Sequence, residues 1–178
     1  MRLLVVIAVL AAALVAGAAV LVLGVGGGGT TAGEPRPVDG AVDTHGLPEP
    51  VAATRAQLLE AAEAGDPDRL AALAGDDFSY SFGGPVEGGP AAFWRAEEER
   101  GGRPLEALAA ILRLPYALAN GLYVWPFAHA VDPRGIGEYE RGLLDDIPGG
   151  APVDDAGYRG WRVGIAPDGT WQFFIAGD

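Results

Sequence analysis

The side chains that could carry acid–base chemistry are few, and they lie far apart in the sequence. His129 is one of two histidines, and its ordinary pKa near neutrality suits a general acid or base. Asp77 would serve as a base if burial raised its pKa, and Tyr80 could assist either group. His129, Asp77 and Tyr80 are therefore the candidate catalytic residues. Each also has a structural interpretation: a strand-end histidine making one hydrogen bond, an aspartate in a turn, and a core aromatic ring.

A second group of residues could line a ligand pocket. Aromatic rings at alternate positions of a strand either fill a core or wall a pocket, and the sequence leaves both interpretations open. Arg162 lies between apolar residues of a predicted strand, where it would bind a ligand carboxylate or pair with an acidic side chain. The candidate ligand-binding residues are Tyr80, Trp94, Tyr123, Trp125 and Arg162.

Composition excludes several classes of function. The chain has no cysteine, which rules out thiol nucleophiles, disulfides and cysteine-based zinc sites. Only two histidines are present, and no nucleotide-binding or metalloprotease motif appears, so we expect neither a metal nor a cofactor. The formal net charge is −12 and lysine is absent, which argues against binding to nucleic acid or to an anionic membrane surface.

The N-terminus predicts export. Residues 3–23 form an apolar run without a charged side chain, long enough to cross a hydrocarbon core of about 30 Å. Arg2 precedes it and should stay on the cytoplasmic side, which places the following domain outside. We therefore expect residues 1–25 to be a single-pass anchor in the cytoplasmic membrane. Small residues at 16–18 and 24–26 leave open a cleaved signal peptide and a secreted or periplasmic product.

The remaining chain divides into a linker and one globular domain. Residues 26–49 are rich in Gly, Pro and Thr, show no apolar period and contain His45, so they predict a flexible linker. Residues 50–178 are long enough to bury a core without a metal or disulfide. In this domain, helices are predicted at residues 50–64 and 67–74, then at 90–100 and 104–114, each bounded by Gly or Pro.

Strands are predicted between and after these helices. Residues 78–82 alternate aromatic and serine side chains, as in a half-buried strand. Asn120-Gly121 separates two apolar runs and predicts a hairpin, whose second strand carries alternating aromatics up to His129 and is interrupted by Pro126. Residues 131–157 predict a lid or a disordered connection with one helical turn near 138–144. A last hairpin is predicted at residues 161–165 and 170–176.

This order of elements resembles the nuclear-transport-factor-2-like superfamily, which includes the SnoaL-like polyketide cyclases. The resemblance covers residues 50–178 and depends on the opening helices with GDPDRLAAL, the segment DDFSYSF and the closing strand GTWQFFIAGD. It implies an α+β fold in which helices wrap a curved antiparallel sheet into a cone with a concave pocket. Members include isomerases, cyclases, dehydratases and binding modules. Residues 50–74 lack the tyrosine of the ketosteroid isomerases, so that chemistry is not carried over.

Two functions follow as alternatives. The first is a non-catalytic binding or interaction domain outside the membrane, taking a small planar or apolar ligand or an envelope protein as its partner. In the ligand case, Tyr80, Tyr123 and Trp125 would wall the concave surface. The second is a cofactor-free cyclase, isomerase or dehydratase with His129 or Asp77 as its base. The second function requires the catalytic candidates to converge in one cavity.

Overall fold

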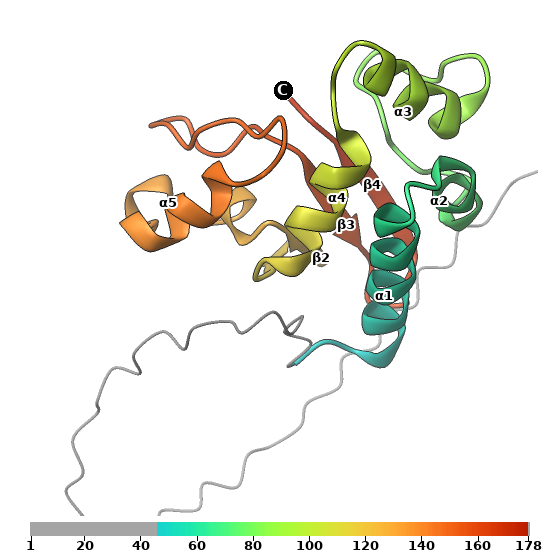
Figure 1. The fold of residues 1–178 in the computed structure, drawn as a ribbon. Helices are drawn as coiled ribbons and strands as arrows, with labels where there is room; N and C mark the ends of the chain where they lie inside the picture. The colour runs from blue at the N-terminus through green and yellow to red at the C-terminus, as the bar shows by residue number, and fades with distance from the viewer. Residues whose placement is uncertain (1–45, 178) are drawn as a thin grey trace, which may run out of the picture. The chain divides into compact units, whose positions relative to one another are not determined.

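The computed structural model describes residues 46–177, which form an α+β domain. A four-stranded antiparallel open sheet in the order β1-β2-β3-β4 is accompanied by five α-helices in this part of the chain (Figure 1). The predicted fold class is therefore confirmed at the level of an antiparallel α+β domain. The predicted N-terminal anchor lies outside the described residues.

The opening helical hairpin forms where the sequence predicts it. Helix α1 spans Glu49–Glu63, and Gly65 follows its end with a φ of 63° that favours glycine. Helix α2 spans Pro67–Leu73, with proline at its first position. The Asp66 side chain caps α2 by accepting a hydrogen bond of 2.9 Å from the Arg69 backbone N–H.

The predicted strand at residues 78–82 is wrong in extent. It is reduced to one parallel bridge, in which the Ser79 N–H donates to the Gln172 carbonyl and the Phe174 N–H donates to the Ser79 carbonyl. Alternation still turns Tyr80 inward, but Phe82 is 57 % exposed. The two glycines and the proline after Phe82 begin a turn, so the segment leaves the sheet edge before a ladder can form.

Two further helices follow and complete the helical layer. Helix α3 spans Gly89–Glu99, and helix α4 spans Pro104–Arg113. Helices α1 and α4 pack against each other and against β3, with the strands behind them in the view of Figure 1. This arrangement places the core between these two helices and one face of the sheet.

The first hairpin of the sheet is built by Asn120 and Gly121. Strand β1 spans Ala117–Ala119 and strand β2 spans Leu122–Trp125. Asn120 and Gly121 have φ values of 51° and 79°, as a tight two-residue hairpin turn requires. Strand β2 is shorter than predicted, because Pro126 offers no N–H to the ladder and residues Phe127–His129 turn into a 3₁₀ helix, η1. His129 therefore does not continue the aromatic alternation of the strand.

The second hairpin supplies the central and last strands. Strand β3 spans Arg162–Ile165 and strand β4 spans Trp171–Ile175, as predicted within one or two residues. Val163 lies opposite both Trp125 and Phe174, so these three side chains share the face that meets the helices.

The turn between β3 and β4 is fastened to the start of α1. Gly169 lies so close to Pro50 that a Cβ atom built on Gly169 would come within 2.9 Å of the Pro50 carbonyl oxygen. The Thr54 hydroxyl also donates a hydrogen bond of 2.6 Å to the Gly169 carbonyl. The beginning and the end of the domain therefore meet at this point.

The first half of the long connection at residues 131–157 forms short helices, and the second half consists of turns and irregular backbone. A 3₁₀ helix, η2, spans Pro133–Gly135, and helix α5 spans Glu138–Asp145. The helical turn predicted near 138–144 is confirmed. Within residues 46–177, no helix is long and apolar enough to cross a membrane.

Candidate functional site

The three catalytic candidates lie in different environments. Asp77 is exposed in the turn after α2, and His129 is exposed at the end of η1. Tyr80 is buried, and its hydroxyl accepts a hydrogen bond of 2.9 Å from the Val86 N–H. Among the described residues, no hydrogen bond or ion pair joins any two of these three side chains. The structure thus assigns Tyr80 to loop packing and leaves the other two at the surface.

His129 does have an electrostatic neighbour that the sequence did not indicate. Desolvation by the surrounding atoms is the larger cause that lowers the pKa of His129, and the positive charge of Arg162 lowers that pKa further. Arg162 is 9 % exposed, and its guanidinium lies 5.5 Å from the Phe82 ring centroid. Two predicted site residues from separate groups, His129 and Arg162, are therefore brought together at one end of the sheet.

Replacing His129 with glutamine is expected to flatten part of the pH dependence of stability. A folded pKa below the unfolded value of about 6.5 means that the unfolded chain binds the proton more readily. Stability is therefore intact above this unfolded value and falls as the pH drops through it toward the folded pKa. Thermal unfolding from pH 8 to pH 5, compared between wild type and H129Q, measures the difference. An unchanged profile would contradict the assigned direction.

Tyr158 belongs to the same neighbourhood and was not found from the sequence. Its hydroxyl donates a hydrogen bond of 3.0 Å to the Trp161 carbonyl, and its side chain is 4 % exposed. Burial raises the pKa of Tyr158, and the nearby charge of Arg162 opposes this shift. Tyr158 lies in a glycine-rich segment without period, where no sequence pattern distinguishes a buried tyrosine from an exposed one.

The aromatic ligand-binding candidates divide between two regions of the core. Trp94 and Trp125 are fully buried, Tyr80 is 9 % exposed and Tyr123 is partly buried. The Trp94 ring stacks on Trp171 at 5.9 Å, whereas Trp125 contacts Tyr116 at 5.6 Å between ring centroids. The indole nitrogens of Trp94 and Trp125 are buried and have no hydrogen-bond partner in the part of the chain described. Neighbouring side chains therefore surround both tryptophans.

Arg55 is a buried charged residue that was not predicted from the sequence. Its side chain is 1 % exposed, its Nε donates to the Leu112 carbonyl at 2.8 Å, and its guanidinium lies 5.3 Å from the Trp125 ring centroid. A signal was present, because Arg55 falls in phase with Val51, Leu58 and Ala62 on the apolar stripe of α1. Arg55, which lies on α1, thus contacts both the end of α4 and strand β2.

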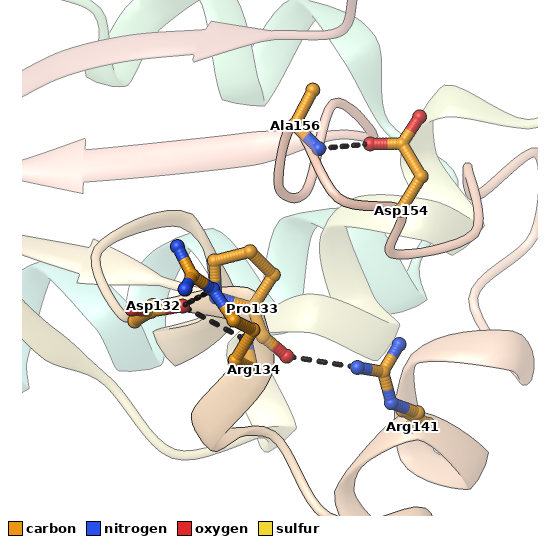
Figure 2. A network of polar contacts seen from close by, with 6 residues as sticks. All are labelled: Asp132, Pro133, Arg134, Arg141, Asp154 and Ala156. Atoms are coloured by element: carbon orange, nitrogen blue, oxygen red, sulfur yellow. Dashed lines mark hydrogen bonds and ion pairs between the residues drawn. The ribbon is translucent and has the colours of Figure 1, made fainter.

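Arg141 organises the long connection from within. Its guanidinium donates to three backbone carbonyls, those of Ile136 at 3.2 Å, Val153 at 3.1 Å and Pro133 at 2.8 Å. Figure 2 shows Arg141 pointing from α5 toward Pro133; Asp132 closes a turn with Arg134 beside Pro133, and Asp154 closes a separate turn with Ala156. One cation therefore holds η2, α5 and the following loop together, which explains why this segment is ordered.

Replacing Arg141 with alanine is expected to loosen residues 131–157 locally. Hydrogen bonds to a charged group contribute about 1.5–3 kcal/mol, so the α5 amides should exchange with solvent about 10- to 100-fold faster. Hydrogen exchange followed by mass spectrometry measures this change peptide by peptide. The matched control is Arg134→Ala, whose side chain is 89 % exposed and should leave α5 protected. Equal exchange in both variants would show that Arg141 does not hold the segment.

The outward side of α5 carries a shallow hollow. It is lined by Glu138, Tyr139, Gly142, Leu143, Asp145 and Asp146. Tyr139 is 55 % exposed there. Within residues 46–177, no group of His, Asp and Glu side chains converges closely enough to hold a metal ion. The hollow therefore combines acidic side chains with an aromatic ring.

The fold and these sites define a small α+β domain with an open antiparallel sheet and an acidic surface. Comparisons with protein-family models, with curated proteins and with solved structures found no match to the chain.

Proposed function

We propose that this protein is a non-catalytic interaction domain held outside the cytoplasmic membrane by an N-terminal anchor. The observation that carries the proposal is the separation of the catalytic candidates. Asp77 and His129 are exposed on different elements, and the Tyr80 hydroxyl is engaged by the Val86 N–H. A general base needs a reacting group and a supporting partner within hydrogen-bond reach, and the described contacts supply neither to Asp77.

Packing of the aromatic candidates favours a protein partner over a small planar ligand. A pocket needs ring faces open to the ligand. The Trp94 and Trp125 side chains have no exposed surface, and each packs against other rings of the core. Exposed apolar and aromatic side chains lie on the outside instead, at Phe82, Leu118 and Tyr139. Such groups are available to another protein without any rearrangement of the core.

For the fold, we propose a member of the nuclear-transport-factor-2-like superfamily with a cone-like sheet. The order of two helices, an extended segment, two helices and two hairpins supports this proposal. So does the bridge between Ser79 and Phe173, which adds the extended segment to the edge of β4. A crystal structure in which residues 78–82 lie away from β4 would contradict it.

The location is tested by a reporter fused after Asp178. Because Arg2 precedes the apolar run, we expect alkaline phosphatase activity, which requires export, and no activity from a cytoplasmic reporter at the same position. Mass spectrometry of the membrane fraction should find residues 3–23 still attached. Reporter activity in the cytoplasm would overturn the proposal, and a mature N-terminus near Ala19 or Gly26 would replace the anchor with a cleaved signal.

A second candidate function is favoured by the electrostatic effect of Arg162 on His129. A lowered pKa keeps the His129 imidazole neutral and able to accept a proton at neutral pH, and Arg162 would hold an anionic substrate beside it. This is the cofactor-free cyclase, isomerase or dehydratase alternative. Turnover of a bound compound that is abolished by His129→Ala, with the fold intact by circular dichroism, would establish this function and displace the first.

A further inference from the structure

One face of α5 is built like a contact surface. Tyr139, Gly142, Leu143 and Asp146 follow one another at helical spacing, and all four line the shallow hollow. Tyr139 is 55 % exposed, whereas Leu144 on the opposite side of α5 is 1 % exposed and belongs to the core. The residues that line the hollow all belong to α5 and its C-terminal cap; Tyr139 and Gly142 are exposed there and Leu143 is partly exposed.

Gly142 leaves a notch in the middle of this face. A Cβ atom built on Gly142 would meet no atom within 4 Å, so the fold does not require glycine there. Glycine inside a helix costs about 1 kcal/mol relative to alanine, and α5 is a helix of 8 residues with little stability to spare. The helix thus carries a destabilising residue whose effect on the surface is to keep the space between Tyr139 and Leu143 open.

The carboxylates around the notch are not neutralised by an arginine of the described domain. Seven arginines of the described domain form ion pairs with Asp or Glu, at Arg69, Arg95, Arg100, Arg103, Arg113, Arg134 and Arg159. Among the same residues, Glu138, Asp145 and Asp146 take part in no ion pair. The one arginine of α5, Arg141, points inward to backbone carbonyls. The face therefore presents negative charge that the domain itself does not offset.

We propose that this face of α5 is the docking surface for a basic segment of a protein partner. The aliphatic stem of a partner arginine or lysine crosses Gly142 between the Tyr139 ring and Leu143. Its cationic group then meets Asp145 and Asp146, with the Tyr139 ring available for a cation–π contact. Charge complementarity selects this occupant, because Asp145 and Asp146 are exposed and take part in no ion pair within the described residues. The inference rests on the proposed interaction function and names the chemistry of its partner.

The test uses the full-length chain in neutral detergent and a fluorescein-labelled hexa-arginine peptide, followed by fluorescence anisotropy at 0.15 M salt. The double variant D145N/D146N is expected to weaken binding about tenfold, because rim charges at a real docking site contribute specifically to the complex. The matched control is E98Q/E99Q, which removes the same charge from exposed, unpaired carboxylates on α3. That control should change the affinity for the peptide less than about twofold, since it alters only electrostatic interactions from charges outside the α5 face, which salt screens.

Gly142→Ala separates docking from folding. The added methyl group meets open space, so it should raise the melting temperature while it fills the notch and weakens peptide binding about threefold or more. Equal losses in D145N/D146N and E98Q/E99Q, or unchanged binding by G142A, would overturn docking on α5. Neither result contradicts the proposed interaction function. That function would be contradicted by reporter activity in the cytoplasm or by turnover that His129→Ala abolishes.

Discussion

Trp125→Ala is expected to lower the free energy of unfolding by about 3–5 kcal/mol, the usual loss for a large aromatic side chain in a packed core. The Trp125 ring has no exposed surface and packs against both Tyr116 and Arg55. Neighbours on several sides cannot all collapse into the vacated volume, so a cavity remains. Denaturant unfolding of the full-length chain, followed by circular dichroism, measures the loss.

Two control variants test whether the loss in Trp125→Ala comes from the removal of a buried ring. Leu118→Ala removes an apolar side chain that is 65 % exposed on β1 and should change the free energy of unfolding by less than about 0.5 kcal/mol. Trp125→Phe keeps most of the ring volume and removes the indole nitrogen that is buried without a hydrogen-bond partner. It should cost clearly less than alanine. A small loss in Trp125→Ala itself would mean that the ring lines a void, and a small-ligand pocket would then regain support.

Arg55→Ala is expected to cost about 2–4 kcal/mol, through lost packing of the side-chain stem and lost hydrogen bonds from a charged donor. Arg55 is the most deeply buried charged residue of the described domain, and its Nε donates to the Leu112 carbonyl at the end of α4. The same denaturant unfolding measures the effect. The control is Arg69→Ala, which removes a solvent-exposed pair with Glu60 and should cost less than about 1 kcal/mol.

A double-mutant cycle shows whether Arg55 and Trp125 act together. The guanidinium lies 5.3 Å from the indole centroid, a distance at which a desolvated cation–π contact contributes about 2 kcal/mol. The double variant should therefore lose less free energy of unfolding than the sum of the losses in the two single variants. Strict additivity would show that the two side chains stabilise the core independently, and that Arg55 acts through α4 alone.

Local chain chemistry predicted much of this fold. Pro67 after the Asp66 cap, Gly65 at the end of α1, and Asn120-Gly121 each act through neighbouring backbone atoms, so the sequence alone is sufficient to place the elements they bound. The prediction was wrong where a distant contact or a turn decides the outcome. The segment around Ser79 has the alternation of a strand, but the turn after Phe82 removes it from the sheet after one bridge.

The candidate sites were harder to predict than the helices and strands, because they depend on contacts between residues far apart in the sequence. His129 and Arg162 are separated in the chain, and the turn of η1 after Pro126 puts them within electrostatic reach. Arg141 resembles any surface arginine in sequence, because its three acceptors are backbone carbonyls that have no residue signature. Arg55 could have been found, since a charged residue in phase with an apolar stripe indicates burial.

The contact between Gly169 and the start of α1 has a mechanical consequence. If the domain is tethered through its N-terminus as proposed, a pull on the tether reaches the described domain at residues 46–50, where Leu47 packs against the core and α1 begins. There the Thr54 hydroxyl holds the Gly169 carbonyl, and Gly169 lies against Pro50, so the load passes directly into the hairpin of β3 and β4. That hairpin contains the central strand of the sheet. We therefore expect part of the tension to be transmitted to the paired strands at this point, instead of acting on α1 alone.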